Sequence, residues 1–159
     1  MSIFENILQI LENNQISYKL IEHEPVFTME QAAKVCSHKP VQGVKTLLAK
    51  LYSSKRQFDY WLVVWQGNEQ IIFDELTSQQ SYKKWKFAQP DEVLFDIGVE
   101  VGALAPFGYV QKYPTIFDKR LLEQEQVYIN AGVHDKTIAL APRDLFQILE
   151  QFSSKCIQY

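Results

Sequence analysis

Apolar residues recur at helical spacing near both ends of the chain. At the start, Ser2 and Glu5 form a capping box. The apolar positions that follow, up to residue 14, are Ile3, Phe4, Ile7, Leu8 and Leu11. Near the end, Pro142 opens a segment whose apolar stripe consists of Leu145, Ile148, Leu149 and Phe152. Both patterns predict amphipathic helices that pack on a core.

Between these helices, short alternating or apolar stretches predict strands. They cover residues 18–22, 44–52, 58–65, 84–87, 115–118, 127–130 and 136–140. The run from Tyr60 to Trp65 is apolar throughout, so this strand should be buried on both faces.

Three more helices and a helical turn are expected in the middle of the chain. The segments are 29–36, 69–78 and 90–97 for the helices and 119–123 for the turn. Thr28 and Gln31 form a capping signal for the first of them, and Pro90 opens the third. The Ile-Ile-Phe stretch within 69–78 is equally compatible with a strand.

Together the elements predict an α+β fold. We expect one domain over residues 1–159 with a mixed, mostly antiparallel central sheet of about six or seven strands and peripheral helices. With 47% hydrophobic residues and 13% aromatic ones, the chain should be well packed, and disorder is expected only in its last few residues.

Net charge and cysteine content bear on the mode of RNA binding and on the cellular location. The formal charge of −3 is not the global basic signature of a nucleic-acid-binding protein, so an RNA partner must be bound by a local patch. Cys36 and Cys156 lie far apart and no secretory leader is apparent, so a cytoplasmic location is expected. No uncharged stretch approaches the about 20 residues of a membrane span.

Residues 98–109 contain three glycines and a proline in otherwise apolar sequence. Glycine permits positive φ angles and lets a ligand approach the main chain, while proline rigidifies a turn. Such a loop presents N–H donors to an ester or phosphate oxygen, which indicates one wall of a pocket. A structural turn between two core elements is the alternative.

Lys45 is the ionisable group with the clearest functional context. It follows Gln42 and Gly43 and begins an apolar strand, so its ammonium is expected at the mouth of the fold, where it can hold a phosphate or a developing anion. The alternative is an ordinary lysine in solvent at the end of a strand.

The histidines, the cysteines and the other basic residues give weaker indications of function than Lys45 does. His23, His38 and His134 lack metal-ligand spacing, so we expect neither a metal nor another cofactor. Cys36 lies at the expected C-terminal end of a helix, which disfavours a thiolate and makes a cysteine-dependent hydrolase a weak third possibility. Basic residues and a tryptophan form either a track for single-stranded RNA or a solvated face. They are Lys83, Lys84, Trp85, Lys86, Lys112, Lys119 and Arg120.

Several segments, taken in order, carry a resemblance to a known family; they are 21–28 with Ala32 and Ala33, 44–48, 98–108, 114–118, 129–132 and 141–145. In this order they resemble the YbaK/ProX family of aminoacyl-tRNA deacylases, which is similar to the editing insertion domain of bacterial prolyl-tRNA synthetases. The segments cover nearly the whole chain.

The resemblance implies hydrolysis of the ester in a mischarged tRNA, most often tRNA(Pro) that carries a small wrong amino acid. It places the catalytic function on Lys45 and Gly102. It implies a substrate-binding region at His23, Thr28, Thr46, Ala103, Pro106, Phe107, Gly108, Asn130 and His134. Some members carry an asparagine that helps to select alanine where this chain has Thr46, so an alanine preference is not implied. Neither Asn130 nor His134 is assigned a catalytic role.

The resemblance also implies the partners: the acceptor end of aminoacyl-tRNA, with prolyl-tRNA synthetase as a candidate protein partner, and neither DNA nor a membrane. The terminal ribose hydroxyl can orient water, so the protein needs only to position the ester and stabilise charge. A catalytically silent domain of the same fold that binds tRNA or a protein is the alternative.

Overall fold

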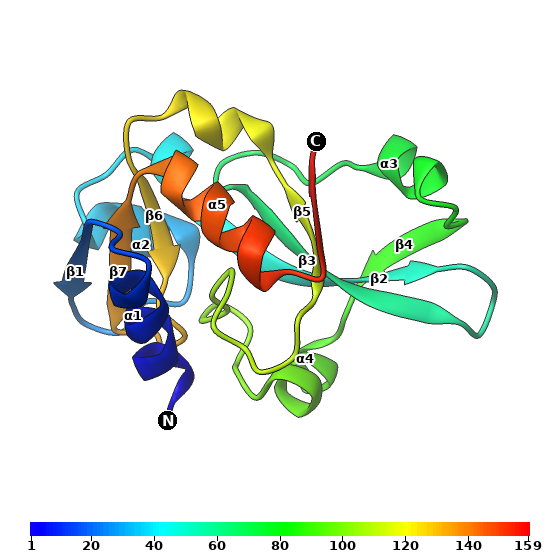
Figure 1. Cartoon of the computed structure of the whole chain (residues 1–159), viewed down its shortest axis with the longest axis horizontal. Helices are drawn as coiled ribbons and strands as arrows, with labels where there is room; N and C mark the ends of the chain where they lie inside the picture. Colours follow the sequence, from blue (N-terminus) through cyan, green and yellow to red (C-terminus); the bar gives the residue numbers. More distant parts are fainter.

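The computed structural model describes all 159 residues and contains eight strands, which form two sheets, together with five α-helices (Figure 1). The helices are α1 (Ile3–Asn13), α2 (Met29–Val35), α3 (Asp74–Gln79), α4 (Pro90–Ile97) and α5 (Pro142–Phe152). The short 3-10 helices are η1 (Pro40–Gln42) and η2 (Lys119–Glu123). The strands are β1 (Tyr18–Glu22), β2 (Val44–Tyr52), β3 (Phe58–Gln66), β4 (Lys84–Phe87), β5 (Pro114–Phe117), β6 (Val127–Asn130), β7 (Lys136–Leu140) and β8 (Lys155–Gln158).

The strands divide between two sheets rather than forming one. Strands β1, β7 and β6 make an antiparallel three-stranded sheet, and the five-stranded sheet has the order β4-β2-β3-β5-β8. Within the larger sheet, β4 and β3 are antiparallel to β2, whereas β5 and β8 run parallel to their neighbours. A single bridge between Gly43 and Tyr128 joins the two sheets. The α+β class is therefore confirmed, with the β6–β7 hairpin paired to β1 instead of extending the larger sheet.

The strands β2 and β3 form the centre of the molecule because both of their faces are buried. Val44, Val64 and Leu48 lie on the face that packs against α1, α5 and residues 103–107. Ala49 and Trp65 lie on the other face, which packs against the segment from Ile71 to Leu76. The expected burial of the apolar run in β3 is confirmed for residues 61–65. Beyond this centre, the β2–β3 hairpin extends away from the three-stranded sheet (Figure 1).

The predicted helix over 69–78 is only half helical. Its helix α3 begins at Asp74, because the carbonyls of residues 69 and 70 accept hydrogen bonds from the side chains of Lys45 and Trp65. These side chains hold a turn in place of a helical start.

The end of the chain also differs from expectation. The last residues form β8, which pairs in parallel with β5. The strand is four residues long, which is too short for its sequence pattern to predict it. It forms because the edge of β5 is available for pairing.

Candidate functional site

A pocket of about 610 Å³ opens where the start of β2, the N-terminus of α2 and the turn after β3 meet. Its lining residues are Thr28, Met29, Glu30, Pro40, Lys45, Gly67, Asn68, Glu69 and Gln70. Lys45 is the one cationic side chain in this lining, and Glu30 and Glu69 are the two acidic ones. The pocket therefore offers both a cation for an oxygen and carboxylates for an ammonium group.

The Lys45 amine is half-buried and already held at one point. Its Nζ donates to the main-chain oxygen of Glu69 over 2.5 Å. Burial lowers the pKa of this ammonium below its ordinary value, although the negative charges of Glu69 and Asp118 oppose the shift. An ammonium has three donors, so two remain for a ligand in the pocket.

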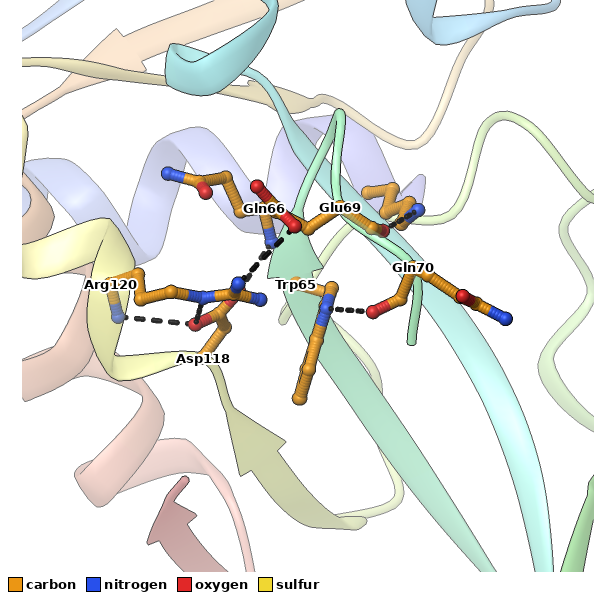
Figure 2. Close-up of polar contacts among 7 residues, drawn as sticks. Trp65, Gln66, Glu69, Gln70, Asp118 and Arg120 are labelled. Atoms are coloured by element: carbon orange, nitrogen blue, oxygen red, sulfur yellow. Dashed lines mark hydrogen bonds and ion pairs between the residues drawn. The ribbon is translucent and has the colours of Figure 1, made fainter. Parts of the chain in front are cut away.

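The turn that holds Lys45 is anchored by Asp118, which lies directly after β5 and is 1% exposed. The Asp118 Oδ2 accepts from the Gln66 main-chain N–H at 3.0 Å. Arg120 donates to the same carboxylate twice, from Nε to Oδ1 and from Nη2 to Oδ2, both at 2.9 Å (Figure 2). This bidentate pair fixes the last residue of β3, where the turn begins.

Two further contacts fix the rest of the turn. The Trp65 Nε1 donates to the main-chain oxygen of Gln70 at 3.1 Å, and Arg120 Nη1 lies 3.4 Å from the Glu69 carboxylate (Figure 2). Sequence reasoning missed the positioning role of Asp118, Glu69 and Arg120. The available signal was a lone acidic residue after an apolar strand, with a basic residue two positions later.

Met29 seats α2 against the strands that carry this turn. A Cβ at Gly43 would lie 2.4 Å from the Met29 Sδ, and a Cβ at Gly67 would lie 2.8 Å from its Cγ. The two glycines thus leave the space that the methionine fills. Thr28 caps the same helix, as predicted, because its hydroxyl accepts from the Gln31 N–H at 3.2 Å.

Gly102 belongs to a second cluster. Its φ is +95°, and a Cβ there would lie 3.2 Å from the Phe27 carbonyl oxygen and 3.6 Å from the His134 Cε1. The His134 ring lies 4.4 Å from the Phe27 ring, and its two nitrogens are 3.2 Å from the Val26 oxygen and 3.1 Å from the Glu100 carboxylate. The loop, His134 and residues 26–27 therefore pack together.

The two clusters adjoin the same segment but do not share a pocket. Thr28 lines the Lys45 pocket, whereas its neighbour Phe27 contacts Gly102. By alternation along β2, Lys45 points to the face of Ala49, while Ala103 packs on the opposite face. Convergence of the amine and the loop on one ester thus requires a ligand that reaches past residues 27–28.

Most other predicted ligand residues have a packing or hydrogen-bonding function. His23 ties β1 to β7, since its Nε2 lies 2.8 Å from the Thr137 hydroxyl. Thr46 is buried in β2 opposite Val64, and Asn130 is half-buried opposite Thr137. The four predicted ligand positions of the glycine-containing loop that follow Gly102 are all buried; they are Ala103, Pro106, Phe107 and Gly108. A cavity beside Pro106, Phe107 and Gly108 measures about 10 Å³, which suffices for no more than a water molecule. Gly108 also borders a pocket of about 560 Å³ beside the start of α1.

Comparison with known proteins identifies the family. Residues 23–148 match the model of the aminoacyl-tRNA editing domain. The chain belongs to this family. The matched region includes the Lys45 pocket, the glycine-containing loop and His134. None of the helices has the length and the apolar composition that a membrane-spanning helix requires.

Individual relatives are similar over most of the chain. The prolyl-tRNA editing protein ProX of Acetoanaerobium sticklandii is 26% identical over 155 residues, which cover 94% of this chain and 92% of that protein. The uncharacterized protein YwhH of Bacillus subtilis is 27% identical over 119 residues, 74% of this chain and 72% of its own.

Solved structures share the fold of this editing domain. The crystal structure of a candidate trans-editing enzyme for prolyl-tRNA synthetase matches with a TM-score of 0.79 and 19% identity over 99% of this chain and 96% of that one. Hypothetical protein APE2540 matches with a TM-score of 0.80 and 20% identity over 96% and 97% of the two chains.

Proposed function

We propose that this editing domain hydrolyses the ester of mischarged aminoacyl-tRNA in trans, with tRNA(Pro) carrying a small non-cognate amino acid as its substrate. Membership of the editing family supports the reaction class, and the name of the ProX relative supports the choice of tRNA(Pro). One observation carries the proposal: the half-buried Lys45 ammonium faces a pocket with two donors still free.

The chemistry of the pocket suits an acyl ester. In the reaction, water adds to the ester carbonyl carbon, and the ribose oxygen then leaves and takes up a proton. The donors of Lys45 stabilise the negative charge that develops on the carbonyl oxygen. Of the two lining carboxylates, Glu30 forms no ion pair and suits the α-ammonium group of the amino acid, whereas Glu69 lies 3.4 Å from Arg120.

The substrate itself supplies the missing reactive group. No cysteine, serine or histidine lines the pocket, and the hydroxyl of Thr28 is used to cap α2. The free hydroxyl of the terminal ribose is adjacent to the ester, so it can orient the attacking water without a protein nucleophile. This is a substrate-assisted mechanism.

The need for a second site follows from binding energetics. A synthetase pocket built for proline discriminates weakly against a smaller side chain, because one methylene contributes only about 1–3 kcal/mol. A separate pocket that accepts the small residue and excludes proline removes the error.

A panel of tRNA(Pro) charged separately with Ala, Ser, Thr, Cys or Pro tests the proposal. The protein should release one or more of the small non-cognate residues and leave Pro-tRNA(Pro) intact. Lys45→Ala should lower this rate by about 10²–10³-fold, as expected for the loss of one oxyanion donor. Lys34→Ala, an exposed lysine on α2, is the matched control and should keep the wild-type rate.

Two results would contradict the proposal. Wild-type turnover by Lys45→Ala would reject the role of that amine. Binding of tRNA without hydrolysis of any ester in the panel would favour the catalytically silent alternative.

We propose that the protein acts in the cytoplasm, where tRNA is charged, and that prolyl-tRNA synthetase is its candidate protein partner. Co-elution of the purified protein with the synthetase in size-exclusion chromatography, with and without tRNA(Pro), tests the partnership. Separate elution under both conditions would show that it acts alone.

A further inference from the structure

Two lysines of β4 lie over a single aromatic ring of β2. The Lys84 Nζ is 5.1 Å and the Lys86 Nζ is 5.3 Å from the centroid of the Tyr52 ring. The antiparallel register explains this arrangement, because it places Tyr52 opposite Lys84 and Lys50 opposite Lys86. Tyr52, Lys84 and Lys86 together form what we call the Tyr52 cationic surface.

The two lysines are exposed and form no ion pair, whereas their neighbour Lys50 is neutralised. The Lys50 Nζ lies 2.6 Å from the Glu92 carboxylate, and that carboxylate also accepts from the Gln89 N–H. Each Glu92 oxygen thus accepts from a donor other than Lys84 or Lys86, and the charge of Glu92 is balanced by Lys50. The positive charge of Lys84 and Lys86 remains available on the surface.

The structure also separates this surface from the wider basic track that the sequence suggested. Trp85 points to the opposite face of β4, where its ring stacks on Phe73 at 4.1 Å and its Nε1 donates to Asp74. Arg120 belongs to the Asp118 pair at the other end of β3. The aromatic component of the surface is therefore Tyr52 and not Trp85.

We propose that the Tyr52 cationic surface binds phosphates of the acceptor stem of the tRNA whose ester occupies the Lys45 pocket. This inference rests on the proposed function. Unpaired ammonium groups attract a polyanion, and the aromatic ring beneath them fixes their position. Because the whole chain carries a formal charge of −3, RNA binding has to use a local surface of this kind.

The spacing along β2 sets how far the RNA has to reach between the two sites. Lys45 is the second residue and Tyr52 the last of the nine in this strand, which separates them by about 23 Å at about 3.3 Å per residue. With the spacing of about 3.4 Å per nucleotide that a B-form strand has, this straight-line span corresponds to about seven nucleotides. Lys45 and Tyr52 point to opposite faces of β2, so the RNA must pass the edge of the strand between them.

The test uses uncharged tRNA(Pro), so it does not depend on hydrolysis. Binding is measured by fluorescence anisotropy from about 50 to about 200 mM salt. The double variant Lys84→Gln/Lys86→Gln is compared with Lys19→Gln/Lys34→Gln, which removes the same charge from exposed lysines elsewhere. Thermal unfolding of each variant verifies that it is folded.

Loss of two phosphate contacts should lower the slope of log K against log salt by about 1.4–1.8, with the control double variant at the wild-type slope. An unchanged slope in Lys84→Gln/Lys86→Gln overturns the proposal. An equal decrease in both double variants also overturns it, because the effect would then come from net charge alone. If the slope responds as expected while no ester is hydrolysed, the surface is supported and the proposed function fails.

Discussion

The Lys45 Nζ lies 2.5 Å from the main-chain oxygen of Glu69, and the Glu69 side chain meets the Arg120 guanidinium at 3.4 Å. Arg120 in turn donates to the buried Asp118, so a chain of contacts through Glu69 and Arg120 connects the Lys45 amine to Asp118. The geometry of the proposed site thus depends on residues that do not line the Lys45 pocket, since neither Asp118 nor Arg120 is part of its wall.

Replacement of Asp118 should test this dependence. Asp118→Asn removes the charge that Arg120 and the Gln66 N–H contact, so we expect a loss of about 2–3 kcal/mol in the free energy of unfolding. Urea denaturation measures this loss. Deacylation by the folded variant should fall through kcat, because the turn no longer holds Lys45 in place.

Arg120→Lys provides the graded control for this experiment. It keeps the positive charge but loses the bidentate geometry, so its effects should be smaller in the same direction. Wild-type kcat in folded Asp118→Asn would contradict a positioning role.

The pH dependence of deacylation should reflect the Lys45 ammonium. Burial lowers the pKa of this group, so rising pH should remove its charge, and with it the enzyme-dependent rate, below the ordinary lysine value of 10.5. Rates corrected for spontaneous hydrolysis from about pH 7 to about pH 10 measure this alkaline limb. In Lys45→Arg, the guanidinium stays charged over this range, so any remaining activity should lack the limb. The same limb in both proteins would assign it to another group.

Gly98 and Gly102 both have a positive φ, but only Gly102 has neighbouring atoms that an added Cβ would contact. Comparing alanine variants of the two therefore distinguishes the effect of backbone conformation from the effect of a steric contact. Gly102→Ala meets the Phe27 carbonyl at 3.2 Å, whereas a Cβ at Gly98, φ +86°, has no atom within 4 Å. Gly98→Ala should lose about 1 kcal/mol of stability from conformation alone, and Gly102→Ala should lose more. Only Gly102→Ala should displace residues 26–28 and slow deacylation. Thermal unfolding and the tRNA(Pro) panel measure both effects, and equal loss of activity in the two variants would exclude a specific role for Gly102.

Modification of the thiols should test the alternative in which the protein is a cysteine-dependent hydrolase. Burial raises the pKa of Cys156 to about 12, so at about pH 8 its thiolate fraction is about 10⁻⁴. Iodoacetamide should therefore label Cys156 rapidly only after unfolding, as followed by mass spectrometry. Alkylation of Cys36, which lies outside the pocket lining, should leave deacylation intact. Loss of deacylation both after alkylation and in Cys36→Ser would support a cysteine-dependent hydrolase.

Local pattern accounts for most of the secondary structure that the sequence predicted. The capping pairs Ser2–Glu5 and Thr28–Gln31, the apolar stripe of α5 and the apolar run of β3 depend on residues a few positions apart. Their energetics are local, so they can be read without coordinates. The turn at residues 69–70 and the strand β8 could not be predicted, because both depend on partners far along the chain.

The sequence by itself determined the α+β class, through periodicity, and the editing family, through the resemblance of segments in order; the role of Lys45 stays a prediction. Only the tertiary structure decided that the strands form two sheets, that Asp118 and Arg120 anchor the turn beside Lys45, and that Tyr52 rather than Trp85 accompanies the free lysines. Each of these results depends on strand register and on the direction of side-chain alternation. A shift of one residue in the register of a strand would move each of its side chains to the other face of the sheet, and no local sequence pattern specifies the register.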